Sequence, residues 1–218
     1  MGKETIPKNW PSSTPYLSQP SFAPHLSKVQ RECLRIRSPD LVETIPAHFP
    51  RGPCSSVRIV PISDPSHPAN GQAGLFAARH LEPGTLILPY YGLVHSSLPP
   101  HSLNHEKSDY DLWLNREAGV AVDAAQAGNE ARFVNDYRGV GERPNAEFRQ
   151  CWDLRGGQQC MAVFVLPAGK NAAGKAGAGG IPKGTEILVS YGKGFWSKRR
   201  EEEQESTAGE AGAFGGSA

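Results

Sequence analysis

Apolar residues in this chain fall in short runs that glycine or proline bounds. From Gly74 onward these runs are GLFAA, TLILPYY, GVAVDA, CMAVFVL and EILVSY, each five to seven residues long. Runs of this length between turn residues are typical of β-strands, whereas helices usually need ten or more residues. The pattern therefore predicts a mainly β domain with few helices.

The first 68 residues hold 12 of the 19 prolines. Proline removes a backbone donor and clashes inside a helix, so long helices are excluded there. We expect residues 1–56 to form an extended arm that wraps the domain, with one short helix around residues 27–37. The first strand of the domain is expected at residues 57–60.

Two further segments are expected to lie outside the packed domain. The sequence NAAGKAGAGG lies in a loop over residues 168–181 and lacks the Lys-Ser/Thr ending of a phosphate-binding loop, so a mobile insertion is predicted. Residues 197–218 begin with charged residues and end in glycine, alanine and serine, which predicts a disordered tail.

Charge and cysteine content limit the class of partner. With 23 basic and 22 acidic residues the net charge is +1, which argues against a nucleic-acid partner. No apolar run is long enough to span a membrane, and no signal segment is recognisable. The four cysteines lack zinc-site spacing, so we expect free thiols in the nucleus or cytoplasm. We also expect the protein to be a monomer.

A histidine pair is the one candidate for a metal site. His101 and His105 are four residues apart, a ligand spacing if the stretch were helical. No glutamate follows the first histidine and Pro99-Pro100 precede it, so we predict a loop without a metal.

Several motifs share one order along residues 57–196. They are Gly74-Leu75-Phe76-Ala77, Tyr90-Tyr91-Gly92, Val122-Asp123-Ala124, GNEARFVN at 128–135, Pro144-Asn145, Gly184-Thr185-Glu186-Ile187 and Tyr191-Gly192. Together they resemble the SET-domain lysine methyltransferase family, which transfers a methyl group to a protein lysine. The resemblance implies a mainly β, β-clip fold of short curled sheets with a knot-like C-terminal threading. It also implies S-adenosyl-L-methionine as cofactor, S-adenosyl-L-homocysteine as product, and a protein or peptide as substrate.

The same resemblance implies the site residues. Tyr191 corresponds to the catalytic tyrosine near the methyl group, and Tyr110 to a tyrosine that lines the lysine channel or touches the cofactor. Both are expected to be catalytic residues and to contact the cofactor. Phe195 and Trp196 either cover the adenine and the channel or simply anchor the C-terminal segment. The remaining cofactor contacts are expected from Ala73, Gly74, Leu75, Arg132, Phe133, Asn135 and Asp136.

Tyrosines suit this chemistry for physical reasons. Methyl transfer from a sulfonium is an in-line displacement, so the enzyme mainly aligns donor and acceptor. The accepting amine must be neutral, which costs about 4.6 kcal/mol at pH 7 for a lysine of pKa ~10.4. An apolar channel lowers this cost, and tyrosine supplies apolar walls with a hydroxyl that orients the nitrogen.

The chain departs from the family pattern after Asn135. Asp136-Tyr137-Arg138 replaces the usual His-Ser-Cys, so a histidine that often braces the catalytic tyrosine is missing. No cysteine follows Cys160, so the zinc cluster of many histone-directed members is absent. Gln72 stands where the family has a first glycine, a role that Gly71 is expected to take.

Two questions stay open at this point. Val189 or Phe148 is expected at the channel position that limits the number of methyl groups, and neither brings a further hydroxyl, which favours more than one methyl group. A product spectrum with only monomethyl-lysine would contradict this. The alternative to an enzyme is an inactive SET-like module that binds a peptide or the cofactor.

Overall fold

The computed structural model describes residues 6–167, 179–192 and 196. The predicted tail, most of the predicted loop 168–181, and Phe195 lie outside these residues. No helix among the described residues is long and apolar enough to cross a membrane.

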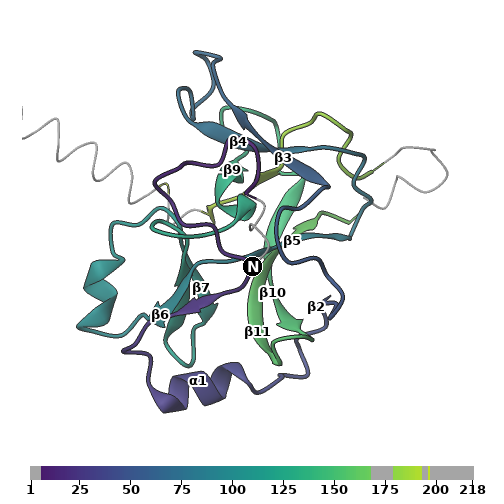
Figure 1. The fold of residues 1–218 in the computed structure, drawn as a ribbon. Coiled ribbons are helices and arrows are strands. Elements are labelled where there is room, and N and C mark those ends of the chain that lie inside the picture. The colour runs from purple at the N-terminus through teal and green to yellow at the C-terminus, as the bar shows by residue number, and fades with distance from the viewer. Residues whose placement is uncertain (1–5, 168–178, 193–195, 197–218) are drawn as a thin grey trace, which may run out of the picture.

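Two four-stranded sheets and two strand pairs make up the domain (Figure 1). The first sheet has the order β1–β6–β8–β7, with bounds Ser21–Phe22, Leu93–Ser96, Val120–Asp123 and Asp111–Asn115. The second has the order β2–β10–β11–β5, with bounds Thr44–Ile45, Ala146–Asp153, Gln158–Val165 and Leu86–Tyr90. The pairs are β3 with β4, Val57–Pro61 and Ala73–Ala77, and β9 with β12, Asn135–Asp136 and Leu188–Val189.

Helices are few and short. In the described part of the chain, the helices with complete bounds are α1 (Lys28–Leu34) and two 3-10 helices, η1 (His101–Asn104) and η2 (Glu130–Phe133). The prediction of a mainly β fold of short curled sheets is therefore confirmed.

Continuous burial explains why the apolar runs form central strands. Every residue of β8 is buried, and so are all residues of β11 except Gln158. One core cluster draws side chains from β3, β4, β5, β8, β11 and β12. A strand that is covered on both faces has no polar side, which is why these runs do not alternate.

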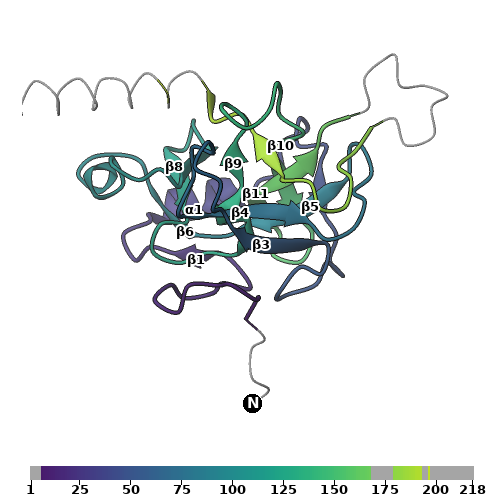
Figure 2. The same ribbon diagram turned by 90° about the horizontal axis from the view of Figure 1, so that it is seen from above.

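The N-terminal segment takes part in both sheets. β1 pairs in parallel with β6, and β2 pairs in parallel with β10. The expectation that the first strand begins at residue 57 is therefore wrong. Strands of two residues carry no periodicity, so a proline-rich sequence hides them. Figure 2, from above, shows the segment before β1 running along the outer side of the domain.

The predicted short helix near residues 27–37 is confirmed as α1. Ser27 and Gln30 form a capping box, in which each side chain binds the other's backbone N–H. The side-chain amide of Gln30 also donates through Nε2 to Ser96 Oγ at 3.0 Å and to the Gly119 carbonyl at 3.0 Å. One buried side chain thus starts the helix and ties it to the first sheet.

The C-terminal segment lies against the stretch 135–145. β12 pairs in parallel with β9, with Leu188 opposite Asn135. Further along, the Asn145 N–H donates to the Leu188 carbonyl at 2.9 Å, and Asn145 Oδ1 accepts from the Leu188 N–H at 2.9 Å. Both ends of the stretch 135–145 therefore contact Leu188. These contacts bring residues that are more than fifty positions apart in the sequence into one site.

Candidate active site

A cavity of about 590 Å³ lies where β9, β12 and η2 meet the N-terminal segment. Ligand sites usually occupy about 300–1,000 Å³. Five stretches that are distant in the sequence contribute to the wall. The lining residues are Asn9, Pro11, His67, Pro68, Ala69, Gln72, Ala73, Asp109, Tyr110, Arg132, Phe133, Asn135, Asp136, Arg138, Tyr191 and Trp196.

The first polar residues of the stretch 128–135 hold the segments around the cavity in place. Asn129 Oδ1 accepts from the Tyr91 N–H at 3.1 Å, and its Nδ2 donates to the Pro89 carbonyl at 2.8 Å. The carboxylate of Glu130 accepts from the Tyr16 hydroxyl at 3.0 Å and from the Cys54 N–H at 2.7 Å. Both side chains are buried. They pin β5 and the N-terminal segment to η2, so the wall of the cavity has a fixed support.

The next residues form one face of the cavity. Arg132 Nε donates to the Ala124 carbonyl at 2.9 Å, which holds the guanidinium in place. Its central carbon lies 4.6 Å from the ring centroid of Tyr110 and 5.2 Å from that of Phe133. Trp10 packs edge-on against Phe133, with centroids 5.6 Å apart. Aromatic rings and a fixed cation thus lie side by side.

Asn135 lies beside a buried carboxylate. Its Nδ2 donates to Glu186 Oε1 at 2.8 Å and approaches the Ala73 carbonyl at 3.4 Å. Gly74 leaves the room for this carboxylate, because a Cβ there would lie 2.4 Å from Glu186 Oε1. A glycine is therefore required by a close approach and not by its own backbone angles.

Asp136 braces Tyr191. Its Oδ2 accepts from the Tyr191 N–H at 2.6 Å, and its Oδ1 accepts from the Arg138 N–H at 2.8 Å. Arg138 also forms an ion pair with this carboxylate at 3.0 Å. The Tyr191 hydroxyl donates to the Val134 carbonyl at 2.7 Å. Burial, followed by the charges of neighbouring groups, raises the pKa of Tyr191, so the phenol keeps its proton at neutral pH.

The site residues predicted from the sequence divide into two groups, those that line the cavity and those that do not. Ala73, Tyr110, Arg132, Phe133, Asn135, Asp136, Tyr191 and Trp196 line the cavity. Leu75 and Val189 are fully buried in the core, and Phe148 packs edge-on against Tyr90 with centroids 5.4 Å apart. Among the described residues, Gly74, Leu75, Phe148 and Val189 do not line the cavity.

Several lining residues were not predicted from the sequence. Asn9 and Pro11 come from the proline-rich segment, and His67, Pro68 and Ala69 come from the loop between β3 and β4. None of them belongs to a motif, so only tertiary packing brings them to the site. Asp109 and Arg138 were not predicted either, although Asp109 precedes the predicted Tyr110 and Arg138 lies two residues after the predicted Asp136.

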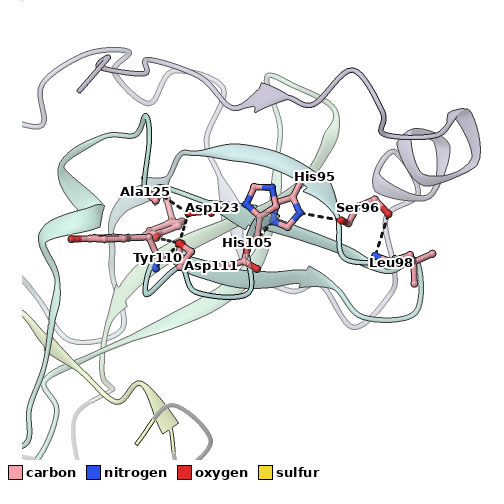
Figure 3. Close-up of polar contacts among 10 residues, drawn as sticks. His95, Ser96, Leu98, His105, Tyr110, Asp111, Asp123 and Ala125 are labelled. Atoms are coloured by element: carbon pink, nitrogen blue, oxygen red, sulfur yellow. Dashed lines mark hydrogen bonds and ion pairs between the residues drawn. The ribbon is translucent and has the colours of Figure 1, made fainter. Parts of the chain in front are cut away.

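Two stacked histidines lie beside Tyr110, on the side away from its ring (Figure 3). The rings of His95 and His105 are stacked, with centroids 3.5 Å apart. His105 Nδ1 lies 2.7 Å from Asp123 Oδ2, and the other oxygen of Asp123 accepts from Ser108 Oγ at 2.8 Å. Ser108 Oγ in turn accepts from the Tyr110 N–H at 3.2 Å. In Figure 3 the ring of Tyr110 points away from the two imidazoles. The cluster therefore supports the backbone of Tyr110 rather than its ring.

The surroundings of His95 favour its protonated form. Its Nε2 lies 2.9 Å from Asp111 Oδ1 and its Nδ1 lies 3.1 Å from the Ser96 carbonyl, and both partners only accept hydrogen bonds. Burial lowers the pKa of His95, but the hydrogen bond and charge of Asp111, the Ser96 carbonyl and Asp123 outweigh it. The net pKa is therefore raised above the ordinary 6.5.

A raised pKa in the folded state makes stability depend on pH. Protonated His95 stabilises the folded state fully below pH 6.5, the ordinary pKa of histidine. This contribution is lost as the pH rises through the raised pKa of His95 in the folded protein. We expect His95→Gln to be less stable than the wild type at about pH 5.5, with a difference in unfolding free energy that shrinks toward about pH 8.5. Urea titrations of both proteins across this range measure the difference. A difference that stays constant or grows with pH would contradict the account.

No group of three or more histidine, cysteine, aspartate or glutamate side chains in the described part of the chain is arranged to hold a metal ion. His101 lies in η1 and stacks on His25 with centroids 3.9 Å apart, whereas His105 binds Asp123. The two histidines thus turn to different partners.

The fold and the cavity together define a mainly β domain with a ligand-sized site beside the paired strands β9 and β12. The family model described as "SET domain" matches residues 72–192, more than half of the 218 residues. The chain belongs to the SET-domain family, as its motifs indicate.

Solved structures from Chaetomium thermophilum are similar to the chain. They include a humanized mutant of the Polycomb Repressive Complex 2 bound to the inhibitor GSK343 (22% identity, 65% of this chain, 16% of that chain, TM-score 0.47). The crystal structure of that complex gives 23% identity over 66% and 16% of the two chains, with a TM-score of 0.48. A structure described as ctPRC2 bound to S-adenosylmethionine gives 22% over 71% and 17%, with a TM-score of 0.49. The chain thus spans about a sixth of these chains' length. No curated protein sequence matches it.

Proposed function

We propose that the protein is an S-adenosyl-L-methionine-dependent protein-lysine N-methyltransferase. The observation that carries the proposal is the convergence of residues that the family resemblance implies. Ala73, Tyr110, Asn135 and Tyr191 come from four separate stretches and line one cavity. The chain belongs to a family in which these motifs serve methyl transfer, and this supports methyl transfer as the chemistry of the cavity.

The cavity fits the cofactor in size and in lining. The cofactor pairs a zwitterionic amino-acid end with an adenine ring, and it supplies a methyl group on a positively charged sulfur. Both hydrogens of the Asn135 amide face acceptors, so its Oδ1 is the atom left to accept from an ammonium group. Phe133 and Trp196 would offer rings to the adenine. On this proposal Arg132, Asp136 and the backbone at Ala73 complete the wall that holds the cofactor.

Tyr191 and Tyr110 would act on the lysine. The Tyr191 hydroxyl donates a hydrogen bond to the Val134 carbonyl, and a phenol oxygen also accepts hydrogen bonds, which on this proposal come from the lysine amine. A fixed acceptor of this kind orients the nitrogen for in-line attack. The cation-accepting ring of Tyr110 is already covered by Arg132 on one face, so its role would be to shape the channel.

The replacement of histidine by Asp136 does not leave Tyr191 unsupported. The carboxylate binds the Tyr191 backbone directly and is itself held by Arg138. A charge-assisted bond of this type is stronger than a neutral one. This supports an active enzyme over an inactive binding module.

The substrate is a protein or peptide lysine, and we propose that the enzyme acts on it as a monomer in the nucleus or cytoplasm. All four cysteines are free thiols, which suits a reducing compartment.

Transfer of labelled methyl groups into a whole soluble extract tests the proposal. We expect a labelled protein band, and amino-acid analysis of that band should show methyl-lysine. Label on another amino acid would contradict the lysine assignment. If the protein binds the cofactor but labels nothing in extracts from several sources, the inactive-module alternative is favoured.

A further inference from the structure

The loop between β3 and β4 folds back on itself and carries His67 to the wall of the cavity. Its base is closed by two backbone bonds between Ile62 and residues 71–72, each 2.9 Å long. Its tip is held by the Ser66 N–H, which donates to Asp64 Oδ1 at 2.9 Å. Pro68 packs against Gly139, where a Cβ would lie 2.6 Å from its Cγ. His67 thus sits on a loop that is fixed from both sides.

The proton of His67 is placed by its neighbours. The Ala69 N–H lies 3.0 Å from Nδ1, so this nitrogen accepts. The other nitrogen, Nε2, then carries the hydrogen and donates to Glu186 Oε2 at 3.1 Å. The two side chains are only 10% and 8% exposed. A buried carboxylate of this kind needs such a donor.

The second oxygen of Glu186 orients Asn135. Oε1 accepts from Asn135 Nδ2 at 2.8 Å, and the other amide hydrogen approaches the Ala73 carbonyl at 3.4 Å. With both hydrogens directed to the wall, Oδ1 is the group of Asn135 that remains for a ligand. Three side chains therefore form a line, His67–Glu186–Asn135, from the loop to the cavity.

We propose that His67 is a positioning residue of the cofactor site. Through Glu186 it holds the Asn135 amide so that Oδ1 accepts from the ammonium group of the cofactor; this rests on the function proposed above. Without the His67 donor, Glu186 Oε2 loses its partner and the carboxylate turns to find another. The Asn135 amide then loses its fixed orientation.

Two substitutions at His67 separate positioning from packing. Glutamine can place an N–H where Nε2 lies, whereas leucine fills the space without a donor. We expect His67→Leu to weaken S-adenosyl-L-methionine binding by about tenfold, as the loss of a bond to a charged group suggests, and His67→Gln to restore most of the affinity. Calorimetry gives the dissociation constants, and melting curves show whether each variant is folded.

A matched control is His80→Leu. His80 lies 3.6 Å from Glu82 in a pair whose side chains are 40% and 70% exposed. The same change there should leave the affinity for the cofactor unaltered. Glu186→Gln gives an independent readout, because one of its two ends must then turn an N–H toward a donor, and binding should weaken as in His67→Leu.

Three results would overturn the proposal. Wild-type affinity in His67→Leu means that His67 positions nothing. Equal weakening in the leucine and glutamine variants, with equal loss of thermal stability, means that the imidazole only packs. If the wild-type protein itself does not bind the cofactor, the function proposed above fails, and this proposal fails with it; in the first two cases only this proposal fails.

Discussion

Replacing Tyr191 by phenylalanine is expected to lower methyl transfer by on the order of 10²-fold, the loss typical of a misplaced reactant. The affinity for S-adenosyl-L-methionine should stay within about threefold. The ring remains to line the cavity, and Asp136 binds the backbone N–H rather than the phenol. The change removes the hydroxyl that would orient the lysine nitrogen, together with its hydrogen bond to the Val134 carbonyl. Single-turnover transfer and calorimetry on the same samples measure the two effects separately.

The matched control for this change is Tyr137→Phe. Tyr137 follows Asp136 in the sequence and packs its ring on Arg138, and it does not belong to the cavity lining. It should transfer methyl groups at the wild-type rate. If Tyr191→Phe keeps full activity, or loses cofactor binding together with activity, Tyr191 does not have the role proposed for it.

The second large effect is expected from Gly74→Ala. The new methyl group would lie 2.4 Å from Glu186 Oε1 and 3.1 Å from Ile62 Cδ1. The carboxylate must then move away from Asn135 and His67. Overpacking of this kind usually costs about 1–3 kcal/mol of unfolding free energy. We also expect cofactor affinity to fall by at least about tenfold, because the fixed orientation of Asn135 is lost.

Gly141→Ala is the control for Gly74→Ala. A Cβ at residue 141 would meet its nearest neighbour, Leu188 Cδ1, at 3.7 Å, which is ordinary contact. Urea titration should show a change within about 0.5 kcal/mol there. If Gly74→Ala were as mild as this control, the close approach between Gly74 and Glu186 would not be tight in solution.

The strands that the sequence predicts are those that the core covers. The runs at β4, β5, β8, β11 and β12 are apolar enough to be recognised. Strand β10 was not predicted because its sequence, AEFRQCWD, mixes charged and apolar residues and follows no clear alternation. It is held by eight register positions against β11, an interaction that a local pattern does not reveal.

The candidate site divides in the same way. Of the site residues that the resemblance implies, Ala73, Asn135 and Tyr191 line the cavity together, whereas Gly74 and Leu75 do not. The motifs do not show that Asn129 and Glu130 hold the segments around the cavity in place while Arg132 and Asn135 face the ligand space, because that depends on which way each side chain points. Nor does any motif include His67, which reaches Glu186 across 119 positions of sequence.

Calorimetric titration of the full chain with S-adenosyl-L-methionine shows directly whether the cavity binds the cofactor. We expect one binding site per chain, weakened by at least about tenfold in Asn135→Ala because the acceptor for the ammonium group is removed. Binding that Asn135→Ala leaves unchanged would place the cofactor elsewhere. No binding at all would contradict the assignment of this cavity as a cofactor site.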